Sequence, residues 1–296
     1  MKKIAKELIT LDSRDQKILA ELFRDGRAHY STIAKNTHIS KDVVSYRVNK
    51  LIEIGGMTNI STIIDIARLG WSSSLVLLKL RNLDKTKLKQ FIEYAVESPF
   101  VVEILELAGA WDYTIRFYYK DSAHLNQLIG GLETEFAELV DYYSIFYISE
   151  NILLPYNALF EKYAVTVPPH KPSNQKIDEL DLRILSAMST DGRKSLAHLQ
   201  VELKENRMTI YNRIKNMRKA NIIQGFRPNL FTEKLGFHWY VIGLKLQGRS
   251  EAKIKTIVTR LKDILPVHFI MTGFGSEDIV FYMQVRAVQE LQKVMY

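Results

Sequence analysis

Apolar residues near the start of the chain recur with the period of a helix, at Ile18, Leu19, Leu22 and Phe23. This spacing predicts an amphipathic helix over residues 11–24. Asp12 stands at its N-cap with Asp15 three residues later, which is the arrangement of a capping box. Gly26 predicts the end of the helix, because glycine readily adopts the left-handed conformation of a helix C-terminus.

The next residues predict two more helices and a strand. A short helix over 31–36 leads through a turn to Ser40, which caps a helix over 41–54. Its buried face follows the positions Val44, Val48 and Leu51. The β-rich run 57–66 predicts a strand or wing. Together these elements predict a winged helix-turn-helix, and a small helical bundle without a ligand is the alternative.

Beyond this unit, the pattern alternates between strands and helices. The predicted strands cover 71–80, 100–108, 112–119 and 141–153, and the predicted helices cover 85–97 and 122–138. The order βαββαβ is that of a ferredoxin-like module, which pairs a sheet face with two helices. The predicted fold class is therefore α+β.

The whole pattern is written twice, with a constant offset of 166 residues. The matched positions include Asp12, Asp15, Gly26, Arg27, Arg47, Gly109 and Asp112, which recur as Asp178, Asp181, Gly192, Arg193, Arg213, Gly275 and Asp278. A constant offset leaves no net insertion between the copies, so we interpret the chain as a tandem duplication of a two-part unit. Residues 131–154 have no counterpart before Tyr296. Either the sequence is a fragment, or the second module lacks its last strand, which would leave a sheet edge unpaired.

These observations predict five segments, in which Pro168, Pro169 and Pro172 mark a linker between the copies. The segments are a winged helix-turn-helix over 1–66, a ferredoxin-like ligand-sensing and oligomerisation domain over 67–164, the linker over 165–176, a partly degenerate second winged helix-turn-helix over 177–232, and a second ferredoxin-like domain, incomplete at its C-terminus, over 233–296.

Composition narrows the range of functions. A net charge of +8 favours polyanionic partners such as nucleic acid. The absence of cysteine excludes a disulfide framework, thiol catalysis and thiolate metal sites, and it fits a reducing cytoplasm. No apolar run reaches the roughly 18 residues that span a bilayer, and the seven histidines lack metal-ligand spacing. We therefore expect a cytoplasmic protein without membrane association, catalytic residues, metal or cofactor.

The motifs LDSRDQKIL, DGR, ISKDVVSYRVNKL, GG and LG occur in this order before a βαββαβ unit that carries Gly109–Asp112. This arrangement resembles the leucine-responsive regulator/AsnC (Lrp/AsnC) family, and the likeness covers nearly the whole chain, twice. It implies a prokaryotic transcription regulator that binds double-stranded DNA. It also implies a RAM-type ferredoxin-like module that senses an amino acid or similar small effector and forms oligomers. Most members carry one copy, so this chain is similar to a tandem form, whose modules we expect to pair within one chain, between chains, or both.

The outward side of the third helix of each copy, together with Lys35 on the short helix before it in the first copy, supplies candidate DNA contacts. In the first copy they are Lys35, Lys41, Asp42, Ser45, Tyr46, Asn49 and Lys50, and in the second Arg207, Thr209, Tyr211, Asn212, Lys215 and Asn216. Asn49 suits an adenine edge, whereas the lysines suit phosphates. A merely solvated role is the alternative for each residue.

Arg47 and Arg213 lie beside the predicted core of each helix-turn-helix. We expect Arg47 to form an ion pair with Asp12 or Asp15, and Arg213 to pair with the matching aspartates, because acidic and basic positions recur together. A phosphate clamp is the alternative.

The second helix-turn-helix departs from the first at two packing positions. Ala34 becomes Gln200 and Ile39 becomes Glu205, which predicts a weaker seating of the third helix because a buried, unpaired carboxylate costs several kcal/mol. That helix nevertheless stays basic. We therefore expect the first copy to read DNA sequence and the second mainly to bind the DNA backbone.

In the resembled family, the loop between the second and third strands lies near the effector site. The candidate effector-binding residues are accordingly Gly109, Trp111, Asp112, Gly275 and Asp278. Turn formation, with each aspartate bonding backbone amides of the loop, explains the same residues, so both interpretations stay open. The bulky Trp111 departs from the family pattern and would fill such a pocket.

Two other functions fit part of the pattern. Siroheme decarboxylases look like the same two-domain fold with a tetrapyrrole site, which calls for several His and Arg residues converging on the α/β half. The first module offers only His124 and a few arginines. A metabolite sensor with vestigial DNA-binding heads is the third hypothesis.

Overall fold

The computed structural model describes residues 8–81, 84–160, 163 and 176–295. Most of the predicted linker, 165–176, therefore lies outside the described residues. The N-terminal head contains α1 (Ser13–Arg24), α2 (Tyr30–Thr37), α3 (Lys41–Glu53) and β1 (Met57–Ile64). The capping box at Asp12 is confirmed, since its carboxylate accepts the amide of Asp15 at 2.9 Å and the carboxylate of Asp15 accepts the amide of Asp12 at 3.1 Å.

The first module follows the predicted βαββαβ order, after a short 3-10 turn η1 (Ile66–Leu69). Its elements are β2 (Ser72–Leu80), α4 (Lys85–Glu97), β3 (Val101–Glu106), β4 (Tyr113–Tyr119), α5 (Ser122–Glu135) and β5 (Val140–Leu153). Alternate residues of the strands pack beneath α4 and α5, as Ile115 does against Phe91 and Leu125.

The second half of the chain repeats this element order. After α6 (Asn157–Phe160), its elements are α7 (Glu179–Ser189), α8 (Leu196–Leu203), α9 (Arg207–Lys219), β6 (Ile223–Leu230), η2 (Thr232–Leu235), β7 (His238–Leu244), α10 (Glu251–Lys262), β8 (Val267–Gly275), β9 (Ile279–Val285) and α11 (Val288–Met295). The second head and the start of a second module are thus present as folded elements.

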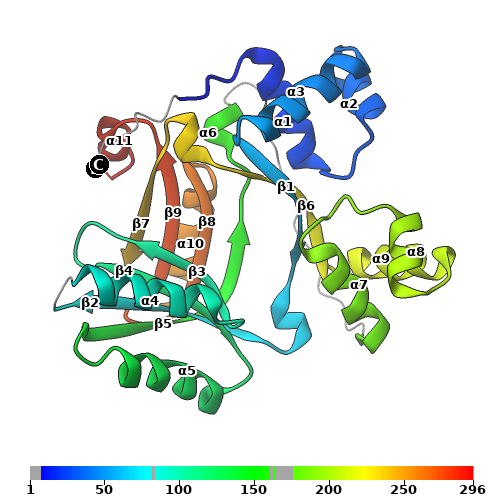
Figure 1. Cartoon of the computed structure of the whole chain (residues 1–296). Helices are drawn as coiled ribbons and strands as arrows, with labels where there is room; N and C mark the ends of the chain where they lie inside the picture. The colour runs from blue at the N-terminus through cyan, green and yellow to red at the C-terminus, as the bar shows by residue number, and fades with distance from the viewer. Residues whose placement is uncertain (1–7, 82–83, 161–162, 164–175, 296) are drawn as a thin grey trace.

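The strand that follows each head pairs with the strand of the other head. β1 and β6 form an antiparallel two-stranded sheet, with Ser61 opposite Arg227 and Thr62 opposite Phe226. We call this pair the head ribbon, and Figure 1 shows it between the two groups of head helices. The strand predicted within 57–66 is confirmed as β1, and among the described residues it pairs with the other head and forms no hairpin wing within its own.

The two modules join into one seven-stranded sheet, in the order β3-β4-β2-β5-β8-β9-β7. The junction is the antiparallel pair β5–β8, which runs from Phe146 opposite Gly275 to Leu153 opposite Phe269. The edge strand β8 therefore finds its partner in the first module. Within the described part of this seven-stranded sheet, β3 and β7 are the edge strands.

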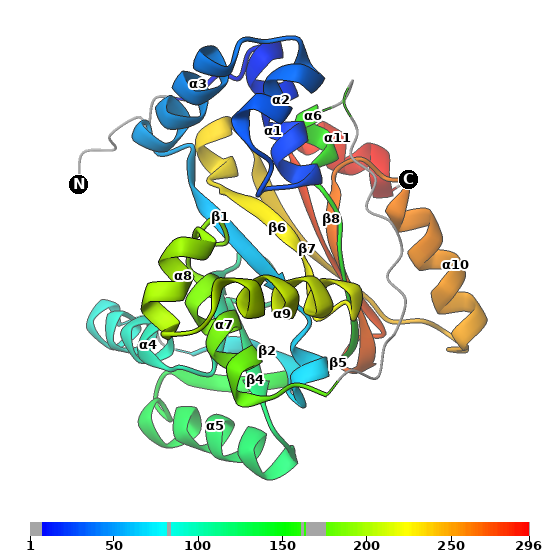
Figure 2. The same cartoon turned by 90° about the vertical axis from the view of Figure 1, so that its right-hand side faces the viewer.

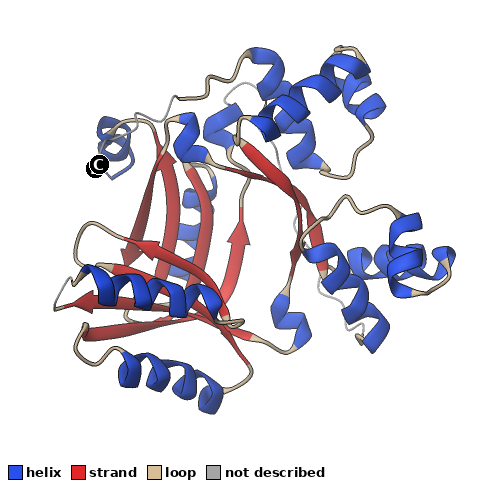
Figure 3. Cartoon of the chain, in the orientation of Figure 1, coloured by secondary structure: helices blue, strands red, loops and turns tan. Residues whose placement is uncertain are grey.

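The sheet curves until its two halves face each other. Leu75 and Leu77 of the first half share a core with Met271 and Val280 of the second. Helices α4, α5 and α10 lie on the outer surfaces, as the blue helices of Figure 3 show, while Figure 2 gives the view turned by 90°. The modules thus pack sheet against sheet within one chain, as the sequence predicts for their pairing.

Candidate nucleic-acid interface

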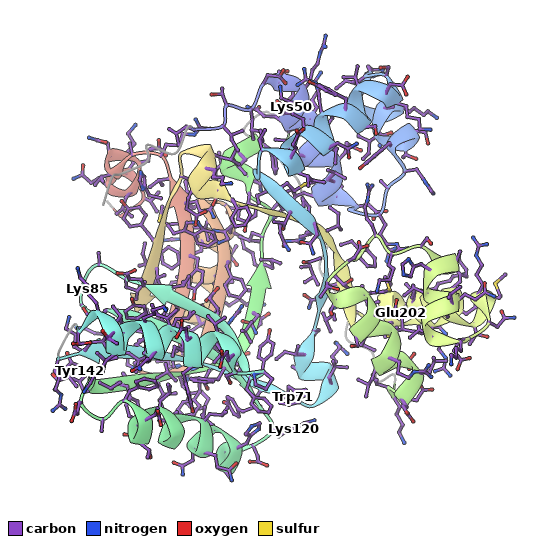
Figure 4. The ribbon with its side chains drawn as sticks, viewed as in Figure 1. Lys50, Trp71, Lys85, Lys120, Tyr142 and Glu202 are labelled. Atoms are coloured by element: carbon purple, nitrogen blue, oxygen red, sulfur yellow. The ribbon has the colours of Figure 1, made fainter. Side chains whose placement is uncertain are left out.

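The third helix of the first head, α3, presents a polar outer surface. Its inner face consists of the buried Val44, Val48 and Leu51, and Ser40 caps its start. The predicted contacts Lys41, Asp42, Tyr46, Asn49 and Lys50 are exposed, as is Lys35 on α2, whereas Ser45 is half-buried. Figure 4 labels Lys50 at the outer end of this helix. The aliphatic underside thus leaves the polar side open to a ligand.

The matching helix α9 has the same construction. Asn206 caps it by accepting the amide of Met208 at 2.8 Å, and its buried face consists of Ile210, Ile214 and Met217. The six predicted contacts of this copy are all exposed: Arg207, Thr209, Tyr211, Asn212, Lys215 and Asn216. Both heads therefore offer an accessible helix of the kind that enters a major groove.

The second head does not bury the carboxylate on which its expected weaker seating depends. Glu205 is only half-buried and lies 3.7 Å from the guanidinium of Arg183, while Gln200 is exposed. The turn keeps its shape, because Lys204 takes the left-handed conformation at φ 55° as His38 does at φ 56°. Because Glu205 stays near the surface, this turn does not bury an unpaired carboxylate.

The expected ion pairs of Arg47 and Arg213 are confirmed. Arg47 lies 2.7 Å from Asp12 and 2.8 Å from Asp15, and Arg213 lies 2.6 Å from Asp178 and 3.3 Å from Asp181. Each arginine ties the third helix of its head to the start of the first.

The environments of the two ion pairs differ. Burial alone would raise the pKa of Asp12, but hydrogen bonds from the Asp15 amide and from Arg47 bring it below its usual value. Asp181 is fully buried and one of its carboxylate oxygens lacks a partner. Burial therefore raises the pKa of Asp181 despite the bond from the Asp178 amide.

Replacement of Arg213 by Met should destabilise the protein more than replacement of Arg47 by Met. The Arg213 variant leaves the buried carboxylate of Asp181 without a cation, and we expect its free energy of unfolding to fall by about 2 kcal/mol. For the Arg47 variant, whose ion pair is half-exposed, we expect a fall of about 1 kcal/mol. Urea unfolding measures the free energy of unfolding of both variants. Because the pKa of Asp181 is raised, its charge is lost as the pH falls, and the deficit of the Arg213 variant should shrink in acid. Equal losses at every pH would contradict this interpretation.

The repeated Asp-Gly-Arg motif joins the two heads. The amide of Gly26 donates to the carbonyl of Phe226 at 2.9 Å, and that of Gly192 donates to Ile60 at 2.7 Å. Arg27 donates to the carbonyls of Gly192 and Lys194, and Arg193 donates to those of Gly26 and Ala28. We call these reciprocal bonds the arginine clasp. The sequence pattern predicted only the end of a helix here. The recurrence of Arg27 as Arg193 was the available signal for a further structural role of these arginines.

The aspartates of the candidate effector loops are already engaged. Asp112 accepts the Leu80 amide at 2.8 Å and the Lys79 ammonium at 3.0 Å, and the amide bond is the largest reason that its pKa is lowered. Asp278 accepts the Leu246 amide at 2.9 Å. The carboxylates thus bond amides at the ends of β2 and β7, not the amides of their own loop as the turn interpretation expects.

The other loop residues have unlike surroundings. A Cβ added to Gly109 would meet nothing within 4 Å, whereas one added to Gly275, at φ +114°, would lie 2.2 Å from the carbonyl oxygen of Ile145. Trp111 is half-buried with its ring 5.4 Å from that of Tyr142, labelled in Figure 4. Gly275 therefore serves the β5–β8 junction, and Trp111 closes the edge of the core between the half-sheets.

The described residues were also searched for metal sites and membrane spans. Within them, no three or more His, Asp or Glu side chains gather as metal ligands would. None of the helices in this part of the chain is both long and apolar enough to cross a bilayer. His170 lies outside the described residues.

Comparison with known proteins identifies both parts of the first unit. Residues 11–55 match the model of a winged helix-turn-helix DNA-binding domain, and residues 73–152 match that of the Lrp/AsnC ligand binding domain. An uncharacterized HTH-type transcriptional regulator of Pyrococcus furiosus is 34% identical over 119 residues, which are 40% of this chain and 78% of the relative. The HTH-type transcriptional regulator FL11 of Pyrococcus horikoshii is 30% identical over 122 residues, or 41% and 79% of the two chains.

Among solved structures, the siroheme decarboxylase NirDL in complex with an iron-uroporphyrin III analogue superposes with a TM-score of 0.63, covering 96% of this chain and 85% of that one. At 14% identity this likeness concerns the fold. The matched domains and the identity to single-copy regulators lead to one conclusion: the chain belongs to the Lrp/AsnC family of helix-turn-helix transcription regulators.

Proposed function

We propose that this protein is a sequence-specific, DNA-binding transcription regulator that arose by tandem duplication and carries in one chain the pair of heads that single-copy relatives obtain by dimerising. The observation that carries the proposal is the pair of exposed helices α3 and α9, each seated on an aliphatic face. Domain boundaries at 66, 164, 176 and 232 are part of the proposal, and so is further association between chains.

The roles of the exposed side chains follow from their chemistry. Ser45, Tyr46 and Asn49 of α3 are proposed to meet base edges, and the lysines at 35, 41 and 50 to meet phosphates. On α9, Arg207 and Lys215 are proposed to bind the backbone. Arg218 and Lys219 extend the basic surface of that helix, and both are exposed.

The test is the salt dependence of binding to duplex DNA. We expect each phosphate neutralised to contribute a slope of about −0.9 in log affinity against log salt, so that five such contacts weaken binding by about 10²–10³-fold between 50 and 200 mM salt. Fluorescence anisotropy with random and genome-selected duplexes measures this slope and the ratio of affinities. Absence of salt-dependent binding would instead favour a metabolite sensor with vestigial heads.

Tetrapyrrole binding is the second candidate function. In this alternative the protein is an enzyme that resembles the siroheme decarboxylases. It is favoured by the burial of His268 and Arg227, which both lie near Tyr156, whereas the first module alone offers His124 and a few arginines. Addition of an iron tetrapyrrole should then give a Soret band with saturable binding. DNA binding without such a band would reject this candidate.

A sensing role belongs to the same proposal, with an amino acid or similar small effector. The loop residues Gly109, Trp111, Asp112, Gly275 and Asp278 remain candidates for it. Melting in the presence of each common amino acid tests this part, since a ligand that binds the folded state raises the melting temperature. A flat response to all of them would remove these loops from the proposal.

A further inference from the structure

A polar cluster lies inside the molecule where the facing half-sheets approach the head ribbon. We call Tyr156, Arg227, Trp239, His268 and Tyr282 the inter-sheet cluster. Arg227 belongs to β6, Trp239 to β7, His268 to β8 and Tyr282 to β9, while Tyr156 follows β5. The cluster therefore draws on both modules and on the head ribbon.

Ring contacts connect the four aromatic members, and Arg227 lies near enough to Tyr156 for the two groups to act on each other. The His268 ring lies 4.6 Å from Trp239 at an interplanar angle of 88°, and 5.0 Å from Tyr156. Tyr282 lies 6.3 Å from His268, and its hydroxyl donates to Glu103 on β3 at 2.7 Å. Since β3 and β9 are far apart in the order of the sheet, this bond crosses the space between the half-sheets.

Several buried polar atoms at this end lack a partner in the described structure. His268 is 3% exposed with an unpartnered Nδ1, and Gln284, which faces inward like Tyr282 two residues before it, is 2% exposed with an unpartnered Nε2. Arg116 Nε also lacks a partner, and the Arg116 guanidinium lies over the ring of Phe269, the residue after His268. Each such atom costs about 1–3 kcal/mol when left alone. Buried polar groups normally have a partner, so this set indicates bound water or a ligand.

The cluster contains one buried cation, Arg227. Arg227 is 9% exposed, and within the described part of the chain its guanidinium donates two long bonds of 3.4 Å, to the carbonyls of Leu153 and Leu154. Among the described residues no carboxylate forms an ion pair with it, while Glu103, which accepts from Tyr282, and Glu233 both act on the neighbouring Tyr156. Burial lowers the pKa of Arg227 to about 10, so the guanidinium remains charged near neutral pH. Burial lowers that of His268 to about 3, which keeps the imidazole neutral.

We propose that the inter-sheet cluster binds a small aryl carboxylate, with the carboxylate on Arg227 and the flat ring against Trp239, Tyr156 and His268. An anion offsets the desolvation of a buried cation, and an aromatic body suits walls made of three aromatic rings and an imidazole. Arg227 would repel an ammonium group placed beside it, so a carboxylate without an amine is preferred over an amino acid. This site is distinct from the candidate loops at 109–112 and 275–278.

The site also has a direct connection to the DNA-binding heads. Arg227 lies on β6 opposite Ser61 of β1, so it belongs to the ribbon that links them. A ligand held by Arg227 contacts the head ribbon and both half-sheets together. Ligand binding here does not depend on the proposed DNA binding; only its regulatory consequence does.

The experiment uses Trp239 as a reporter. The chain has 3 tryptophans, so the full-length double variant Trp71→Phe, Trp111→Phe leaves Trp239 as the sole source of tryptophan emission. The probes are phenylacetate, phenethylamine with the same body and opposite charge, and inorganic phosphate. We expect phenylacetate alone to change the emission saturably and to raise the melting temperature.

Charge variants complete the test. In the reporter background, Arg227→Gln should weaken phenylacetate binding at least tenfold, Arg227→Lys should retain most of it, and the control Arg260→Gln on the exposed side of α10 should leave it unchanged. If Arg227→Gln does not fold, the test compares the affinities for phenylacetate and phenethylamine in Arg227→Lys and in the parent protein. Stronger binding of phenylacetate by both proteins supports the proposal, and equal binding of the two probes contradicts it.

Three outcomes would overturn the proposal. They are equal responses to the acid and the amine, a response to phosphate as large as that to phenylacetate, and no response to any probe. These readouts are independent of DNA, so failure here and failure of DNA binding are distinguishable.

Discussion

Alanine at Lys41, Ser45 and Asn49 together should abolish most of the preference for a selected DNA site over random duplex. A good bidentate side chain–base contact is worth about 1–3 kcal/mol of discrimination, so we expect the ratio of specific to non-specific affinity to fall by about 10–100-fold. All three residues lie outside the buried stripe of α3, so folding should be preserved. Competition binding at fixed salt measures the ratio, and circular dichroism checks the fold.

The matched control exchanges the corresponding residues of the second head, Arg207, Tyr211 and Lys215, which lie 166 positions later. If this head mainly binds the DNA backbone, specific and random duplexes should lose affinity together. The salt slope should then become shallower by about two, because two cations are removed. Equal losses of discrimination from the two sets of variants would reject the division of labour between the heads.

Alanine at Gly275 should be among the most damaging small substitutions in the chain. The residue has φ +114°, and an added Cβ would lie 2.2 Å from the carbonyl oxygen of Ile145 on β5. Strain and displacement of the β5–β8 junction should together cost about 2–4 kcal/mol. The corresponding Gly109→Ala meets nothing within 4 Å, so it should change the free energy of unfolding little.

Urea unfolding of the two variants makes the comparison. Gly273→Ala gives a second case, because its Cβ would lie 1.9 Å from the carbonyl oxygen of Tyr147. Both damaging changes should loosen the contact between the modules, and limited proteolysis would then cleave near the junction. Similar stability for Gly275→Ala and Gly109→Ala would mean that β5 and β8 do not pair as closely as described.

Features controlled by neighbouring residues were predictable from the sequence. The helix over 85–97 is α4 to the residue, the Asp12 capping box forms, and the ion pair of Arg47 was indicated by its recurrence with the aspartates. Helical period, capping and strand alternation act within a few residues, so the local pattern contains them. The polar outer face of α3 follows in the same way from its apolar stripe.

What the local pattern does not contain is the partner of each strand and the neighbour of each buried polar group. An open strand edge accepts any complementary strand, so only the packed chain selects β6 for β1 and β5 for β8. The pairing of β6 with β1 brings the arginine clasp together, and the pairing of β5 with β8 gives Gly275 its role. The inter-sheet cluster brings Arg227 and His268 to residues of the first module, such as Tyr156 and Glu103. Such gatherings arise only when distant segments bury surface together, which is why tertiary structure decided them.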